Sequence, residues 1–307
     1  MVYQRRRIFF GIFTRFAAEA GVLDEETGGK CSEVVDEEPE RGSDRGDLPQ
    51  HDSDQEDHDH DQKDVCLPDS IDFWFVPADE ILRWPADKPL PRHQELRDMG
   101  KLVKFRMNIE DVLSGQFAVD KAAVSHRWTI PEHFDPECVK LRKLQEVLTS
   151  TPSIRYIWID WVCAPQWHGG GRSDAEEAEF RLILENILPF IFLGCRVIVL
   201  FERIYNQRFW PSVECWIATK MATEDGLVPA SEDRLRVQVH GVYSASGKDM
   251  SSRKYVLEEW HQADAQEAIA TLSHPDILVT NEKDKELNLK VVASLDDQIS
   301  RRLTLSI

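Results

Sequence analysis

The feature that most constrains the fold is an alternation of apolar strand patterns with amphipathic helix patterns over residues 121–307. Alternating βα units with connections of this length specify a mostly parallel sheet that is covered by helices on both faces. The five expected strands lie at residues 122–126, 154–163, 195–201, 235–243 and 276–281. We therefore predict a five-stranded, flavodoxin-like α/β domain over residues 121–307, with strand order 2-1-3-4-5.

Short sequence signals mark the ends of the expected helices. Asp135 before Pro136 is typical of a helix start, with Asp135 as N-cap and Pro136 at the first helical position. Ser173 and Glu176 have the spacing of a capping box, and Pro189 is expected to stop the helix that they begin. These signals place one helix after the first strand and one after the second.

The residues before this domain fall into three parts. Residues 1–32 form a basic and apolar segment, and residues 33–65 form an acidic linker with very few large apolar residues. Such a linker cannot bury enough surface to offset the entropy of ordering, so we predict that it is disordered. Residues 66–120 are rich in aromatic residues and hold two short helical patterns, which predicts a lead-in segment packed on the main domain.

Charge and composition exclude several classes of protein. The chain of 307 residues has a formal net charge of −18, which argues against nucleic-acid binding because that task needs a basic face. No segment is long and apolar enough to span a bilayer. The six cysteines are irregularly spaced, which favours reduced thiols and a cytoplasmic location. The Arg-rich N-terminus leaves open mitochondrial targeting or attachment to a membrane surface.

Polar residues follow the carboxyl ends of the first three expected strands. Ser125 and Arg127 follow the first strand, Asp160 lies at the end of the second, and Trp210 and Glu214 follow the third. In open α/β sheets, ligands bind outside the carboxyl ends of the strands at the switch point between the first and third. These side chains are therefore expected to converge on one crevice.

The same stretches resemble a known family. The segments SHRW (125–128), WIDWVCAPQ (158–166) and YNQRFWPSVECWIA (205–218) are similar to a divergent Toll/interleukin-1 receptor (TIR) domain. They are also similar to the related fungal heterokaryon-incompatibility domain, with its W-I-D-x-x-C-x-x-Q segment. The resemblance covers roughly residues 121–225, and it departs from the TIR pattern at Pro211 and at Cys215 with Trp216.

The resemblance implies roles for the expected site residues. In enzymatically active TIR domains, a glutamate four residues after a tryptophan cleaves the nicotinamide–ribose bond of NAD. By resemblance this catalytic role falls on Glu214, with Trp210 packing beneath it. NAD would be a substrate, so no cofactor and no metal site are expected. Many other TIR domains have no detectable activity and act by self-association.

Physical reasoning from the residues supports the same site and leaves an alternative open. Glu214 shares a helix face with Trp210 and lies near a helix start, where backbone N–H groups favour an ionised carboxylate. Arg127 has the chemistry to bind phosphate, and Ser125 to hydrogen-bond a sugar or base edge. The alternative is structural: Glu214 pairs with Arg208 or Arg196, and Asp160 only orients its neighbours. In the same alternative, the SHR segment (125–127) caps the next element and pairs with acids such as Asp160.

Three other groups of residues have simpler explanations. Asp160, Cys163 and His168 suggest a thiol nucleophile, but Cys163 follows an apolar strand without an oxyanion-hole pattern. The histidines at 51, 58 and 60 lie in the acidic tract, where disorder explains them better than a metal site does. The Trp residues at 158, 161 and 167 fit packing and loop anchoring better than base stacking, given the acidic charge.

Two functions are consistent with these observations. One is a TIR-like signalling or defence protein that hydrolyses NAD through Glu214. The other is a non-enzymatic TIR-like module that acts by homotypic assembly, with a structural Glu214. A heterokaryon-incompatibility-like effector of defence or cell death, working by either mechanism, is a third interpretation.

Overall fold

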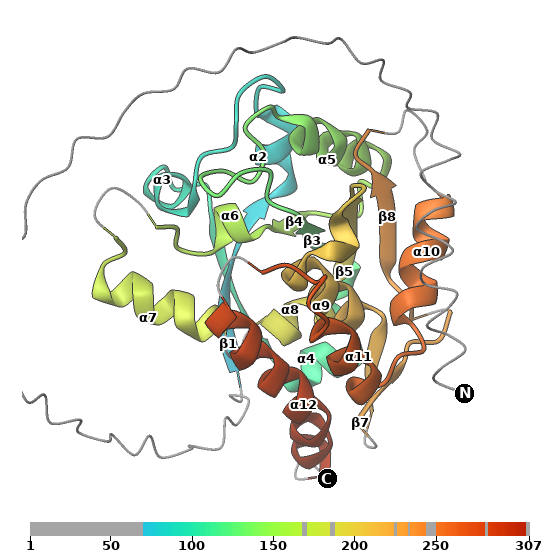
Figure 1. Cartoon of the computed structure of the whole chain (residues 1–307). Helices are drawn as coiled ribbons and strands as arrows, with labels where there is room; N and C mark the ends of the chain where they lie inside the picture. The colour runs from blue at the N-terminus through green and yellow to red at the C-terminus, as the bar shows by residue number, and fades with distance from the viewer. Residues whose placement is uncertain are drawn as a thin grey trace, which may run out of the picture. The chain divides into compact units, whose positions relative to one another are not determined.

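Four of the expected strands form a parallel array in the expected order, within a larger sheet. The computed structural model describes residues 70–167, 171–184, 188–223, 226–232, 234–243, 250–279 and 282–304, all within one compact unit, Gln62–Ile307. The main sheet has six strands in the order β2-β1-β4-β3-β5-β8, and β4, β3, β5 and β8 are mutually parallel. The protein is therefore an α/β protein with a mostly parallel sheet (Figure 1).

The strands are short, and their bounds are as follows: β1 Ser70–Pro77, β2 Val103–Asn108, β3 Lys121–His126, β4 Tyr156–Trp158, β5 Arg196–Phe201, β6 Lys220–Thr223, β7 Gly226–Pro229 and β8 Val237–Gly241. In β3 and β5, Ala122 pairs with Arg196 and His126 with Leu200, so the carboxyl ends of these two strands lie together. All residues of β3 are buried, as expected for a central strand covered on both faces.

Residues 70–120 contribute two strands to the sheet, which the sequence analysis did not anticipate. β1 pairs with β2 in an antiparallel hairpin and continues into an antiparallel pairing with β4, where Val76 lies opposite Ile157. The helical patterns expected in this segment are present as α3 (His93–Asp98) and α4 (Ile109–Ser114). The segments 1–32 and 33–65 lie outside the described residues.

The fifth expected strand, at 276–281, is not seen in the residues that can be described there, 276–279. Leu278 instead forms a single parallel bridge with Arg208. Its backbone N–H donates to the carbonyl of Gln207, and its carbonyl accepts a hydrogen bond from the backbone N–H of Phe209. A separate antiparallel pair, β6 and β7, lies between α9 and β8 in the chain. The five-stranded order is therefore matched only for its first four strands.

The helices have the following bounds: α2 Ala78–Arg83, α3 His93–Asp98, α4 Ile109–Ser114, α5 Val139–Ser150, α6 Asp160–Cys163, α7 Asp174–Leu182, α8 Leu188–Gly194, α9 Phe209–Ala218, α10 Met250–Trp260, α11 Ala265–Leu272 and α12 Glu282–Thr304, with 3-10 turns at Gln116–Val119 and Tyr205–Gln207. Where one helix was expected over 173–188, residues 174–182 form α7 and Leu188 begins α8.

Helix starts differ from the sequence expectation in instructive ways. α5 begins at Val139 rather than Pro136, yet the Asp135 carboxylate still accepts a 2.8 Å hydrogen bond from the backbone N–H of Leu141 in the first turn. The capping box of Ser173 and Glu176 is confirmed at the start of α7. Pro189 does not stop a helix, since it is the second residue of α8, where a missing N–H removes no helical bond.

The crossovers place helices on both faces of the sheet. β4 lies on one side of β3 and β5 on the other, so right-handed connections put α5 on one face and α8 on the opposite face. α9 contacts α8 as well as β3 and β5, so it covers the same face as α8 (Figure 1). The chain order therefore reverses between β3 and β5, which is the switch point where open α/β sheets bind ligands.

The core is continuous from the β1–β2 hairpin to α12. Trp158, Trp216 and Trp260 are among its largest fully buried side chains. None of the described helices combines the length and the apolar character needed to cross a bilayer.

Candidate functional site

Glu214 lies on the buried side of α9, against the end of β3. It is the sixth residue of a helix that begins at Phe209, and it is 8% exposed. The Ser125 hydroxyl donates a hydrogen bond of 2.6 Å to its carboxylate. The structure thus brings together two of the predicted site residues, 89 positions apart in the chain.

A third hydroxyl, which the sequence analysis missed, completes this network. Tyr205 follows β5 and is fully buried, and its hydroxyl shares a short hydrogen bond with that of Ser125. The same hydroxyl donates to the backbone carbonyl of Pro211 at 3.2 Å. Ser125, Tyr205 and Glu214 therefore form a buried chain of exchangeable protons that links β3, the turn after β5 and α9.

The surroundings of Glu214 shift its carboxyl toward the protonated form, contrary to the expectation that they favour an ionised carboxylate. Burial raises its pKa well above the ordinary value of 4.5, the hydrogen bond from Ser125 lowers it in part, and the charge of Asp160 raises it further. Glu214 also lies beyond the first turn of α9, where the influence of the helix dipole has faded. Burial likewise raises the pKa of Tyr205.

The structural alternative for Glu214 required an ion pair with an arginine. No cation among the described residues lies within ion-pair distance of its carboxylate. Arg196 is the first residue of β5, at the opposite end of that strand, and donates to the carbonyls of Ala118 and Val119. The pairing of Glu214 with Arg196 or Arg208 is therefore wrong.

Asp160 holds the neighbouring loops in place. Its carboxylate accepts hydrogen bonds from the His126 ring at 3.0 Å, from the Trp128 indole at 2.6 Å and from the backbone N–H of Trp161 at 2.6 Å. Burial opposes ionisation, but His126 and the two other donors outweigh it and keep the pKa of Asp160 below its ordinary value. Asp160 thus has the geometry of an orienting carboxylate beside the switch point.

Arg127 is engaged by a carboxylate that sequence reasoning missed. Its guanidinium donates to Glu202 at 2.8 Å and to the carbonyl of Trp128 at 2.9 Å. Glu202 also pairs with Lys140 of α5 at 2.7 Å, and both partners are almost fully buried. Burial raises the pKa of Glu202, and Lys140 and Arg127 more than offset this, so the net shift is downward.

A sequence signal for Glu202 exists. It is the acid that directly follows the apolar run of β5, at the carboxyl end of a strand next to β3. Tyr205 has no comparable signal, because a tyrosine four residues past a strand is usually ordinary packing. The last predicted site residue, Trp210, is half-buried, and its ring packs edge-on against Phe209 at 5.8 Å.

The thiol-nucleophile hypothesis is not supported. Cys163 is 1% exposed, and burial raises the pKa of its thiol to about 12, so almost no thiolate exists at neutral pH. Its expected partner His168 lies outside the described residues, as do His51, His58 and His60. Within the described ranges no group of three or more metal-ligating side chains is present.

The tryptophans behave mainly as packing residues. Trp158 packs edge-on against Phe192 at 5.9 Å, and the indole of Trp161 donates to the carbonyl of Leu90 at 2.9 Å. Trp167 differs, since it is 71% exposed in the loop before α7.

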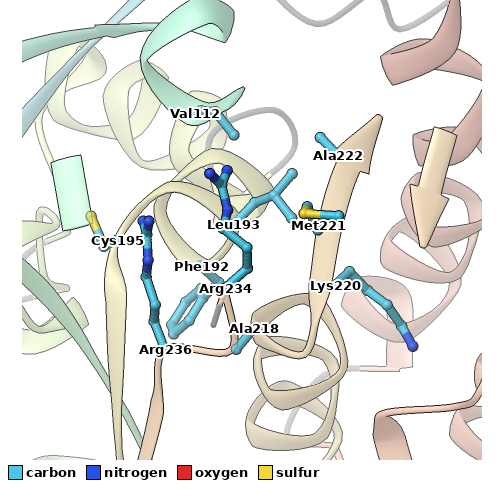
Figure 2. Close-up of a pocket in the computed structure, with 10 residues that line it drawn as sticks. All are labelled: Val112, Phe192, Leu193, Cys195, Ala218, Lys220, Met221, Ala222, Arg234 and Arg236. Atoms are coloured by element: carbon cyan, nitrogen blue, oxygen red, sulfur yellow. The ribbon is translucent and has the colours of Figure 1, made fainter. Parts of the chain in front are cut away.

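Two cavities lie at the amino-terminal ends of the parallel strands, opposite the predicted site. One, of about 20 Å³, is lined by residues of α8, α9, β6 and the segment before β8 (Figure 2). The second, of about 390 Å³, is lined by residues 118–119, Arg196 and residues 235–238. None of the five predicted site residues lines either cavity, because they lie at the carboxyl ends of the strands and the cavities at the amino ends.

Comparison with known proteins identifies no relative of this chain. No family model, curated protein or solved structure matches the chain. The fold defines the class of the protein: an α/β protein with a mostly parallel sheet and a buried carboxyl and hydroxyl network at its switch point.

Proposed function

We propose that the chain is a TIR-like signalling or defence protein that hydrolyses NAD at the nicotinamide–ribose bond, with Glu214 as the catalytic carboxyl group. The observation that carries the proposal is a buried carboxyl at the switch point that bonds to Ser125 and has no cation partner among the described residues. Such a group costs stability, and strongly perturbed carboxyl groups gather at functional sites.

The chemistry needs a negative charge beside the ribose. When the bond between ribose C1′ and the nicotinamide nitrogen breaks, the electron pair leaves with nicotinamide and positive charge develops on the ribose ring. A carboxylate at that position stabilises this charge. Water then adds to C1′ and loses a proton, so the products are nicotinamide, ADP-ribose and one proton.

The raised pKa of Glu214 fits this role through the charge of the substrate. The nicotinamide ring of NAD carries a positive charge, and a cation beside a carboxyl lowers the pKa of that carboxyl. The Ser125 hydroxyl already donates to the carboxylate oxygen and favours its ionised form. Glu214 would therefore ionise when the cationic ring binds.

The remaining predicted residues have supporting roles in this proposal. Arg127 supplies positive charge for the pyrophosphate by exchanging its contact with Glu202. Trp210, one helical turn before Glu214, supplies an apolar wall. Asp160 keeps His126 and Trp128 in position at the rim.

The test is release of nicotinamide by the purified full chain incubated with NAD, over a range of protein concentrations. Glu214→Gln keeps the size of the side chain and a hydrogen bond with Ser125, and we expect it to lower the rate at least about a hundredfold. Ser212→Ala, a buried position on the same helix, is the matched control and should retain the rate. Equal turnover by wild type and Glu214→Gln would refute the assignment.

The second candidate is a TIR-like homotypic assembly module without enzyme activity. It is supported by three large apolar residues that are exposed. Ile204 follows β5, Tyr243 follows β8, and Leu278 forms the bridge with Arg208. Light scattering across a concentration series tests it. Self-association that Tyr243→Ser weakens, with no NAD turnover at any concentration, would favour this candidate over the enzyme.

A further inference from the structure

The larger cavity at the amino ends of β5 and β8 has an unusual charge. Its charged lining residues are Arg196 and Arg236, and Arg234 and Lys220 line the smaller cavity that shares Arg236. Among the residues that the structure describes, no aspartate or glutamate lines either cavity, although the whole chain has 55 acidic residues against 37 Lys and Arg. Positive charge is therefore concentrated around these two cavities, at the amino ends of β5 and β8, in a protein whose net charge is negative.

Both arginines of the larger cavity are held by neutral oxygens. Arg196 donates to the carbonyl of Ala118 at 2.6 Å, that of Val119 at 3.1 Å and the hydroxyl of Ser153 at 2.9 Å. Arg236 donates to the carbonyl of Gly115 at 3.0 Å. Neither makes an ion pair with a described residue, so their charges are fixed in place without being neutralised.

Capping of α4 explains only part of this arrangement. The carbonyl of Gly115 follows the last turn of α4, and a basic group is favourable there. Gly115 has a positive φ of 66°, and a side chain at this position would collide with the Arg236 guanidinium. The close approach therefore positions Arg236 but uses only one of its five N–H donors.

The arginines also repel one another. Burial lowers the pKa of Arg236 below its ordinary value, and the charges of Arg234 and Arg196 lower it further. Figure 2 shows the side chains of Arg234 and Arg236 extending in the same direction, while Lys220 points away from them. Lys220 donates instead to the carbonyls of Trp260 and His261. An anion bound between the guanidinium groups would relieve this repulsion.

We propose that the cavity formed by Arg196, Arg236 and residues 235–238 binds a small molecule that carries a phosphate group. Guanidinium groups bind phosphate through paired N–H donors, more selectively than an ammonium group does. The volume of about 390 Å³ lies in the range of small-molecule sites, and Val119, Leu235 and Val237 provide apolar walls for the rest of the ligand. This site is separate from Glu214 and does not depend on NAD hydrolysis.

The test is isothermal titration calorimetry, in which the full chain is titrated with AMP and, separately, with inorganic phosphate, each at two salt concentrations. We expect one AMP per chain, and a dissociation constant that rises at least about tenfold in Arg236→Gln and in Arg196→Gln. Arg142→Gln removes an arginine that, like Arg236, donates to backbone carbonyls but lies elsewhere on the surface, and it should leave binding unchanged. Glu214→Gln should also leave it unchanged, which separates this site from the switch point.

A second measurement uses the wild-type protein and does not depend on the folding of a variant. AMP should protect Arg196 and Arg236 from modification by phenylglyoxal, as located by mass spectrometry, and should leave Arg142 unprotected. Absence of saturable binding, or an equal loss in Arg142→Gln, would overturn the proposal. Binding of a carboxylate-rich peptide with the sequence of residues 45–64, but not of phosphate or AMP, would show that the ligand class is wrong.

Discussion

Ser125 at the end of β3 donates a 2.6 Å hydrogen bond to Glu214 on α9, and both side chains are almost completely buried. This contact joins a central strand to the helix that covers it, at the place where the chain order of the sheet reverses. A polar contact in such a position contributes to stability and also holds the carboxyl group in one orientation. Its two roles can be separated by measurement.

Removal of the Ser125 hydroxyl should destabilise the fold. In Ser125→Ala the buried carboxyl loses its donor, and the Tyr205 hydroxyl loses a partner, so the free energy of unfolding should fall by about 1–3 kcal/mol. Urea denaturation measures this change. Ser150→Ala removes the hydroxyl of an exposed serine that bonds only to a carbonyl of its own helix, and should cost less than about 0.5 kcal/mol. Equal effects of the two substitutions would contradict the role of the network.

The raised pKa of Glu214 should appear as a pH dependence of stability. As pH rises above 4.5, the unfolded chain releases this proton first, while the native protein retains it up to the raised pKa. In that window the free energy of unfolding should fall with pH, by up to about 1.4 kcal/mol per unit. Glu214→Gln has no proton to release at this position. The free energy of unfolding of the variant should therefore increase relative to that of the wild type as pH rises.

Urea denaturation of both proteins between pH 5 and pH 8 checks this expectation, because the contributions of groups that do not interact with Glu214 cancel in the difference. Parallel stability curves for wild type and Glu214→Gln would show that the carboxyl titrates as it does in water.

The local sequence pattern predicted the parallel part of the fold well. The runs that became β3 and β5 have apolar centres, the run that became β8 alternates apolar and polar residues, and each is followed by helical periodicity, so order and direction follow from general rules of connection. The same rules placed Ser125 and Glu214 at one edge. Their direct contact also needs the helix after β5 to pack across β3, and the rule of right-handed crossovers fixes only the face that this helix covers.

The remaining features depend on pairings that local patterns do not encode. The β1–β2 hairpin joins the sheet through β4, and nothing within residues 70–77 specifies that partner. At 276–279, an apolar run makes one bridge to Arg208 in place of a strand, so tertiary context overrides a strand-like pattern. Glu202 and Lys140 come from different parts of the chain, and their pairing appears only once the start of α5 lies near the end of β5.

The buried pair of Glu202 and Lys140 should be costly to break. Lys140→Met leaves the carboxylate with Arg127 as its remaining partner in a site that is almost closed to water, so we expect a loss of about 2–4 kcal/mol of stability. Lys254→Met removes a partner from an exposed pair with Glu258 and should cost less than about 0.5 kcal/mol. The double variant Lys140→Met/Glu202→Gln should recover part of the loss, since the buried carboxylate charge is then gone and the Arg127 guanidinium that loses its partner is partly exposed. A single variant as stable as the wild type would show that Arg127 alone satisfies Glu202.

The buried cysteines should resist thiol reagents. Cys138, Cys163, Cys195 and Cys215 are free and buried, and burial raises the pKa of the Cys163 and Cys195 thiols to about 12 each. At pH 7 only about one molecule in 10⁵ would carry either thiolate, and the thiolate is the reactive form. In a Cys31→Ser/Cys66→Ser variant, Ellman's reagent should therefore label no thiol in the native protein and all four in urea. Rapid native labelling of Cys163 would reopen the thiol-nucleophile hypothesis, because it would require a thiolate beside Asp160 that the buried position disfavours.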